Sequence, residues 1–255
     1  MLRFLSFFLL LILCSIQNTF CDDKAFTIMK NHFDLKSAPC YTARISLMLI
    51  DGKGKKLSRS FNQQNIDRDL FEANYIEVTD PADIAGVRLL SVNTNNRDEQ
   101  RLYLPALAKS RLISGSGNSG KDGRFLGSDI NYFDLENKRL DDAVYSYIGE
   151  EILSGNPCHI IDAAPKDKDC PYFKTRFWVD ANSWLIHKIQ AFDSKNNLIK
   201  EIQNRSYITI NGIHFVKEMV IRDIRRNHTT LYKLHTVDIK TRVSLSVFTV
   251  QHLER

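Results

Sequence analysis

The stretch that decides the fold runs from Phe173 to Ile239 and reads FKTRFWVDANSWLIHKIQAFDSKNNLIKEIQNRSYITINGIHFVKEMVIRDIRRNHTTLYKLHTVDI. Short polar turns separate its five apolar or alternating runs, which are 173–180, 184–192, 198–207, 213–223 and 229–239. Several strands at a spacing of about 8–12 residues are typical of an antiparallel meander. The stretch therefore predicts a mainly β protein.

One of these runs is apolar on both of its faces. Its apolar residues are Ile213, Phe215, Met219 and Ile221, largely on one face, and Val216 and Val220 on the other. Adjacent residues of a strand point to opposite sides of the sheet. We therefore expect one face to meet the core and the other to meet a helix or a ligand.

Similar runs continue through the rest of the chain, at 44–50, 55–61, 71–79, 87–93, 100–104, 110–114, 144–153 and 158–163. Near the N-terminus, two acidic residues precede Phe26, Met29 and Phe33, a spacing that predicts an amphipathic helix. No linker, charge block or internal repeat divides the sequence. We predict one α+β domain over residues 22–255, with about ten or eleven strands.

Composition and charge exclude several classes of protein. Of 255 residues, 43% are hydrophobic and 25% are charged, which argues against both a disordered chain and a multi-span membrane protein. The net charge of +5 is spread along the chain without interleaved aromatic residues, so we expect no nucleic-acid partner.

The first 21 residues have the character of a secretory signal peptide. Arg3 is their only charge, the run from Phe4 to Leu13 is apolar, and a more polar stretch follows. We predict cleavage near Cys21, just before Asp22. A lipidated Cys21 is the alternative, although Phe20 is bulkier than the residue such a site needs.

The local sequence does not support the motifs for catalysis and cofactor binding that the chain contains in part. Residues 115–120 fit a dinucleotide-binding glycine pattern, but no helical periodicity follows to hold a phosphate. The histidines have no metal-ligand spacing, and no G-x-S-x-G elbow occurs. We predict no catalytic residue, metal or cofactor. The Gly- and Ser-rich stretch 114–129 is expected to be a long, mobile loop.

The cysteine positions allow two interpretations, a disulfide or free thiols. Cys158 and Cys170 flank the loop 163–169, so they could face each other across a hairpin. A disulfide closing so short a loop would contribute about 3 kcal/mol in the chain-entropy model. Alternatively, Cys40, Cys158 and Cys170 are all free thiols.

A series of motifs in the middle of the chain carries a resemblance to a known family. The series comprises LYLPAL (102–107), RLIS (111–114), FLGSD (125–129) and YFDL (132–135), with Leu104, Pro105, Arg111, Gly127, Ser128, Asp129, Tyr132 and Asp134 as its marker residues. The chain resembles the outer membrane lipoprotein-sorting proteins, relatives of the periplasmic carrier LolA. The resemblance covers the whole chain after the leader.

The resemblance implies a half-open antiparallel β-barrel with a helical lid over an apolar concave face. It further implies a monomeric periplasmic carrier, without enzymatic activity, that binds lipid or lipoprotein acyl chains and delivers them toward the outer membrane. An RND-type exporter or a membrane acceptor is the implied partner. Gly127, Ser128 and Asp129 are expected to serve structure rather than cargo.

Apolar strand residues are the candidates for the wall of such a cavity. They are Leu47, Leu49, Trp184, Ile186, Phe215, Met219 and Ile221. A register slip of one residue would reverse every one of these assignments. Two rival functions remain open at this point: an envelope hydrolase acting on lipid or glycan, and an accessory subunit that caps an exporter and carries nothing.

Overall fold

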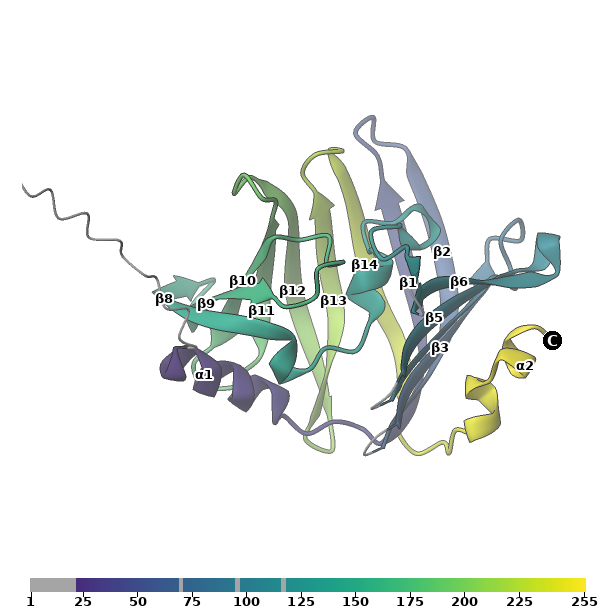
Figure 1. Ribbon diagram of the computed structural model, residues 1–255, viewed down its shortest axis with the longest axis horizontal. Helices are drawn as coiled ribbons and strands as arrows, with labels where there is room; N and C mark the ends of the chain where they lie inside the picture. The colour runs from purple at the N-terminus through teal and green to yellow at the C-terminus, as the bar shows by residue number, and fades with distance from the viewer. Residues whose placement is uncertain (1–21, 69–70, 95–96, 116–117) are drawn as a thin grey trace, which may run out of the picture.

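One curved sheet makes up most of the molecule (Figure 1). The computed structural model describes residues 22–255 apart from 69–70, 95–96 and 116–117. The strands are β1 (Cys40–Ile50), β2 (Lys56–Arg68), β3 (Phe71–Asp80), β4 (Arg88–Thr94), β5 (Arg97–Leu104), β6 (Lys109–Gly115), β7 (Asn118–Ser119), β8 (Ala143–Leu153), β9 (Asn156–Pro165), β10 (Lys174–Asp180), β11 (Ile186–Phe192), β12 (Leu198–Ile210), β13 (Ile213–Asp223) and β14 (His228–Asp238).

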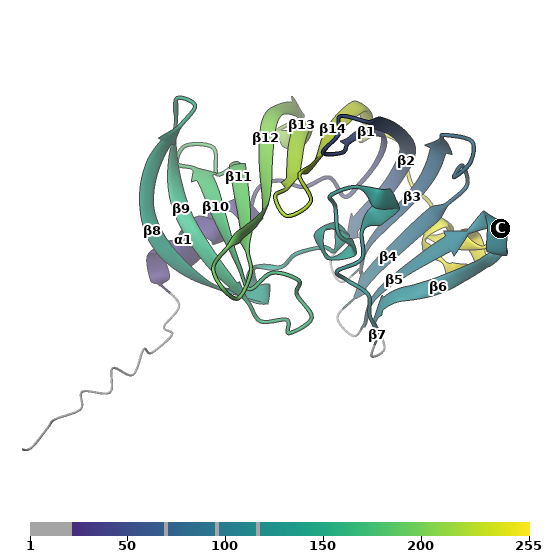
Figure 2. The ribbon, with the colours of Figure 1, turned by 90° about the horizontal axis from the view of Figure 1, so that it is seen from above.

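The order of the strands explains the open shape of the sheet. The order is β7-β6-β5-β4-β3-β2-β1-β14-β13-β12-β11-β10-β9-β8, and each neighbouring pair is antiparallel. The first and last strands therefore pair at the centre, whereas β7 and β8 form the two edges. Figure 2 shows the sheet as an arch seen from above, with two arms that do not meet.

This architecture confirms the prediction of a mainly β, half-open antiparallel barrel. Each of the thirteen runs identified in the sequence contains a strand, and the two-residue β7 brings the number to fourteen. The expected count of ten or eleven strands was too low, because short runs such as 100–104 and 110–114 form full ladder partners.

The chain crosses from one arm to the other through residues 120–142, here called the crossing segment. It contains three short 3-10 helices, η2 (Phe125–Gly127), η3 (Tyr132–Leu135) and η4 (Leu140–Asp142). Phe125 and Tyr132 are buried in the same hydrophobic cluster as Leu47 and Phe61 of the sheet. The crossing segment thus lies inside the arch and covers its concave face (Figure 2).

Helix α1 (Asp23–Phe33) covers the concave face of the other arm. The Asp22 carboxylate caps its first turn by accepting from the backbone N–H groups of Lys24 and Ala25. Ala25, Ile28 and Met29 pack with apolar residues of β8, β9, β10 and β11. The helix predicted from the spacing of Phe26, Met29 and Phe33 is confirmed.

The C-terminal residues pack on the opposite, convex face. The 3-10 helix η5 (Leu245–Phe248) and helix α2 (Val250–Leu253) follow β14. Phe248 and Leu253 join a second cluster with Tyr75 and Leu90, whose neighbours Ile76 and Leu89 belong to the concave cluster. On β3 and β4, the concave apolar residues therefore belong to the first cluster, and the convex apolar residues are covered by η5 and α2.

Several expectations need correction. The helices over the concave face are α1 and the three short 3-10 helices of the crossing segment, so only α1 is an α-helix. Within the expected loop 114–129, Phe125, Ser128 and Asp129 are buried rather than loose. The predicted leader, residues 1–21, lies outside the described residues. None of the described helices is long and apolar enough to cross a membrane.

Of the two alternatives for the cysteines, the structure has the free thiols and not the Cys158–Cys170 disulfide. Cys40, Cys158 and Cys170 are free thiols. The register of β9 and β10 places Cys158 opposite Asp180, whereas Ala163 faces Thr175. Cys158 therefore lies at the far end of the hairpin from the loop that contains Cys170, and the two thiols do not face each other.

Candidate binding site on the concave face

Two cavities lie on the concave face of the sheet. The central cavity has a volume of about 470 Å³ and lies between the middle strands and the crossing segment. The helix-side cavity has a volume of about 320 Å³ and lies between α1, β8–β12 and the crossing segment. The two cavities share three lining residues, Asp134, Ile189 and Ile202. They therefore adjoin across β11 and β12.

Strand register builds the wall of the central cavity. Leu47 of β1 faces Tyr232 of β14, Tyr232 faces Met219 of β13, and all three line the cavity. Residues directly opposite in a ladder share a face of the sheet, so the row is continuous across three strands. All but five lining side chains are apolar or aromatic, the five being Gln63, Asn74, Asp134, Asn204 and His214.

Aromatic side chains close part of this wall. The rings of Tyr41 and Phe215 meet edge to face with their centroids 5.3 Å apart. The Tyr41 hydroxyl accepts from the Gln63 side chain at 3.2 Å, and burial raises the pKa of Tyr41 to about 12. Burial in this largely apolar surrounding thus favours the neutral phenol over the phenolate.

The seven candidate wall residues occupy three kinds of position. Leu47, Phe215, Met219 and Ile221 line the central cavity, and Ile186 lines the helix-side cavity. Leu49 is buried in the concave cluster, and Trp184 packs in the cluster beneath α1. Neither of these two residues lines either cavity. Contact of any of the seven with a ligand stays a prediction.

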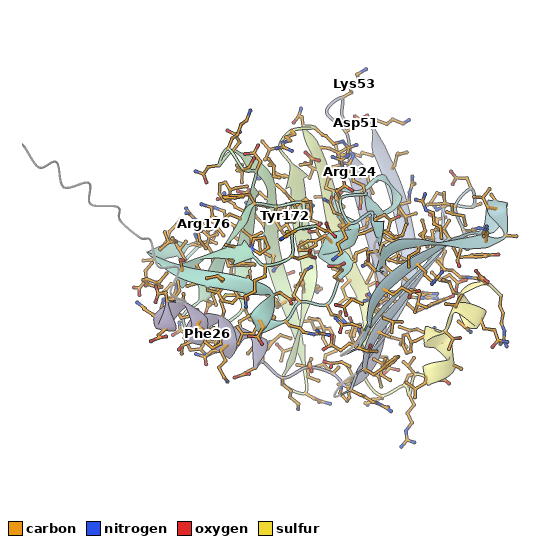
Figure 3. All side chains as sticks on the ribbon, in the orientation of Figure 1. Phe26, Asp51, Lys53, Arg124, Tyr172 and Arg176 are labelled. Carbon is orange, nitrogen blue, oxygen red and sulfur yellow. The ribbon has the colours of Figure 1, made fainter. Side chains whose placement is uncertain are left out.

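A buried ion pair sits on the shared wall of the two cavities. Lys200 of β12 has only 6% of its side chain exposed and donates to Asp134 of the crossing segment at 2.7 Å. Asp134 also accepts from the Tyr172 hydroxyl and the Asn131 backbone N–H, each at 2.8 Å. Tyr172 lies on the concave side of the sheet (Figure 3). This network fixes η3 against the sheet.

The motif Gly127-Ser128-Asp129 anchors the crossing segment to β14. Asp129 is fully buried, and its carboxylate contacts His228 Nδ1 at 2.7 Å and accepts from the Thr230 hydroxyl at 2.7 Å. Gly127 has φ +76°, a conformation that glycine adopts without strain. These residues hold the lining of the central cavity in place and line neither cavity themselves.

The remaining marker residues support the same segment. Leu104 packs against the concave cluster, and Pro105 begins the exposed 3-10 helix that follows β5. Tyr132 is buried, and its carbonyl accepts from Gln100 at 3.0 Å. Burial raises the pKa of Tyr132, while Arg111 of β6 lies close enough to oppose that rise.

The sequence interpretation missed Lys200 and Tyr172. One signal was present, because Lys200 falls at the same face of its strand as Leu198 and Ile202, where an apolar residue is expected. Tyr172 lies in the loop before β10 and carried no signal. Within the described residues, no group of three or more His, Cys, Asp or Glu side chains is placed to hold a metal ion.

Solved structures define the class to which this fold belongs. A structure described as an outer membrane lipoprotein-sorting protein domain from Vibrio parahaemolyticus superposes with a TM-score of 0.85 at 20% identity, covering 91% of this chain and 99% of that one. A LolA superfamily protein from Nitrosomonas europaea gives 0.72 at 12% identity, covering 89% and 98%. The fold is therefore that of the LolA-like lipoprotein-sorting proteins, as the sequence resemblance predicted.

A third solved structure shares the fold, and a family model shows the family. A DUF1329 family protein from Desulfovibrio piger superposes with a TM-score of 0.84 at 25% identity, covering 90% of this chain and 98% of that one. A family model described as "-like: Uncharacterized protein" matches residues 72–255, and the chain belongs to that family. No curated protein matches the chain.

Proposed function

We propose that this protein is a periplasmic carrier that binds acyl chains of a lipid or lipoprotein on its concave face. The observation that supports the proposal best is the pair of adjoining, mainly apolar cavities in an open sheet. Ligand sites are concave, largely apolar and typically about 300–1,000 Å³ in volume. The similarity to a lipoprotein-sorting domain supports the same class of ligand.

The energetics of burial favour such a ligand without any catalytic group. Each buried methylene contributes about 0.8 kcal/mol, so ten methylenes contribute about 8 kcal/mol, equivalent to a micromolar Kd. Ordering of the ligand and the lid offsets part of this gain. Release of the acyl chain would then require an acceptor with an equally apolar binding site.

The crossing segment is held against the sheet mainly by side-chain contacts rather than by a ladder, namely the apolar packing of Phe125 and Tyr132 and polar contacts. The contacts of Asp129 and Asp134 tie it to β14 and β12, so its position can change without breaking the sheet. In this proposal the leader directs export to the periplasm, and delivery is to the outer membrane. An RND-type exporter or a membrane acceptor is the proposed partner, and the carrier acts as a monomer without catalysis.

A cavity-filling variant tests the proposal. Ala43 of β1 is buried and lines the central cavity, whereas the adjacent Thr42 points to the other face. We expect Ala43→Phe purified from the periplasm to carry much less acyl lipid in native mass spectrometry and lipid extraction than the wild type. Thr42→Phe, with the same added ring, should keep the wild-type lipid content.

Thermal unfolding of both variants controls for damage to the fold, since overpacking a core costs about 1–3 kcal/mol. Wild-type protein that carries no acyl species, and that takes up none from offered micelles, would overturn the proposal. So would an equal loss of lipid in the two folded variants.

A further inference from the structure

A third, polar pocket adjoins the helix-side cavity. It has a volume of about 180 Å³ and lies between β4–β6, the crossing segment and the loop after β9. It shares five lining residues with the helix-side cavity, namely Phe133, Lys138, Arg139, Asp142 and Pro165. The concave face therefore offers an apolar space that continues directly into a polar one.

A buried row of polar side chains forms one wall of this pocket. Ser91, Gln100 and Ser114 face one another across β4, β5 and β6, and each is more than nine-tenths buried. Gln100 accepts from Ser114 at 3.4 Å and donates to the Tyr132 carbonyl at 3.0 Å. The buried Ser91 hydroxyl has no hydrogen-bond partner within the described part of the chain.

Buried polar side chains of this kind need hydrogen-bond partners. A buried hydroxyl without a partner carries a desolvation penalty. A polar group that enters the pocket would remove this penalty by bonding to Ser91. The wall thus favours a ligand with a polar end at this place.

Charges of both signs line the pocket. The cations are Lys121, Lys138, Arg139 and Lys166, and the carboxylates are Asp98, Glu99, Glu136, Asp141, Asp142 and Asp167. Lys121 is paired with both Glu136 at 3.2 Å and Asp167 at 2.7 Å. Glu99 is already paired with Arg101, which lies outside the lining, and the other five carboxylates still outnumber the four cations. A ligand end that carries both charges therefore finds partners for each.

Lys138 lies at the boundary between the polar pocket and the helix-side cavity, since it lines both. Its ammonium is 3.2 Å from the centroid of the Phe133 ring and 3.3 Å from a Glu136 oxygen. Burial lowers the pKa of Lys138, and Glu136 opposes that effect only in part. An additional negative group at this position would complete the neutralisation of the ammonium.

We propose that the polar pocket binds the head of an acyl amphiphile that carries one negative and one positive group, while its chain lies in the helix-side cavity. This inference rests on the proposed function and specifies its ligand class. The negative group contacts Lys138 and Arg139 at the boundary. The positive group contacts carboxylates of the pocket lining, and the head bonds to Ser91.

Three single-chain probes of equal chain length test the proposal on delipidated protein by titration calorimetry. They are palmitoyl-lysophosphatidylethanolamine, which is zwitterionic, palmitoyl-lysophosphatidylglycerol, which is anionic, and palmitate. We expect the zwitterionic probe to bind about tenfold more tightly than the other two, the effect of one charge-assisted hydrogen bond. Lys138→Gln should reduce that affinity by about tenfold.

Lys168→Gln is the matched control, because Lys168 is exposed and does not line the pocket. Glu136 keeps its contact with Lys121 when Lys138 is replaced, so the variant leaves no carboxylate without a cation. Equal affinity for all three probes would overturn the head pocket and leave the carrier function standing. Tighter binding of the anionic probe would overturn the assignment of charge, and an equal effect of both variants would overturn the role of Lys138.

Failure of the carrier function has a different signature. In that case none of the three probes binds to the folded wild-type protein, and the inference falls together with the function.

Discussion

Removing the Asp134 carboxylate should destabilise the protein far more than removing the Lys200 ammonium. Lys200 has 6% of its side chain exposed and Asp134 has 17%. In Asp134→Asn the buried ammonium keeps neutral oxygens of Asn131 and Tyr172 but loses its counter-charge. The new amide also has one acceptor oxygen where the carboxylate had two.

The magnitude follows from the burial of the charge that remains. Breaking a buried ion pair from one side costs about 3–5 kcal/mol, because it leaves an uncompensated charge. Asp134→Asn should therefore lower the free energy of unfolding by about 3 kcal/mol. In Lys200→Met the remaining Asp134 keeps its bonds from Tyr172 and Asn131, so we expect a loss of about 1 kcal/mol.

Urea unfolding measures both variants and the double variant on one scale. An unchanged slope of unfolding free energy against urea would show that stability alone has changed. The double variant Asp134→Asn with Lys200→Met leaves no charge unpaired. Compared with Lys200→Met alone, its free energy of unfolding should therefore be lower by no more than the contribution of one hydrogen bond. Equal losses in the two single variants, or a larger loss in Lys200→Met, would refute the reasoning.

Three further predictions concern the crossing segment and the cavity wall. Asp129→Asn should lower the free energy of unfolding by about 2–4 kcal/mol and speed amide hydrogen exchange in residues 125–135, because the fully buried carboxylate holds His228 and Thr230. Gly127→Ala should cost about 1–2 kcal/mol in thermal unfolding, since its φ of +76° strains any residue with a Cβ. Burial raises the pKa of Tyr41 from 10.0 to about 12, so its neutral form stabilises the fold below pH 10 and that stabilisation is lost as pH rises through 12. Because burial also raises the pKa values of Tyr75 and Tyr207 to about 12, the absorbance step centred near pH 12 should be smaller by one phenolate in Tyr41→Phe than in the wild type.

Each of these three has its own contradicting result. Faster exchange confined to the sheet, with residues 125–135 unchanged, would show that Asp129 does not anchor the crossing segment. A Gly127→Ala variant as stable as the wild type would mean that the backbone there relaxes without strain. A step near pH 10 that is smaller by one phenolate in Tyr41→Phe, with the step near pH 12 unchanged, would place that phenol in water rather than in the cavity wall.

The strands could be predicted from the sequence because alternation is a local signal. Each ladder in the arm β8–β14 joins runs that follow one another along the chain, so the turns between the runs were enough to indicate the meander. The pairing of β1 with β14 had no such signal, since it depends on residues such as Ser46 and His235, whose side chains meet at 2.7 Å across 189 positions.

The site was less accessible to prediction for the same reason. Lys200 and Asp134 are 66 positions apart, and nothing near either residue marks the other as a partner. The choice of wall residues depended on which face of each strand turns inward. Phe215 and Met219 were placed on one face by period two, but Trp184 precedes β11 with φ +60°, outside any strand alternation.

The seam between β1 and β14 also dictates an order of assembly. Each arm consists of hairpins between neighbouring stretches of the chain, and such local contacts form early because little loop entropy is lost. The seam joins the first strand to the last, so it closes only when β14 is present. Leu47 and Tyr232 face each other across that seam. A portion of the chain that ends before β14 therefore lacks this part of the cavity wall. We therefore expect the concave face to enclose a ligand only after β14 has paired with β1.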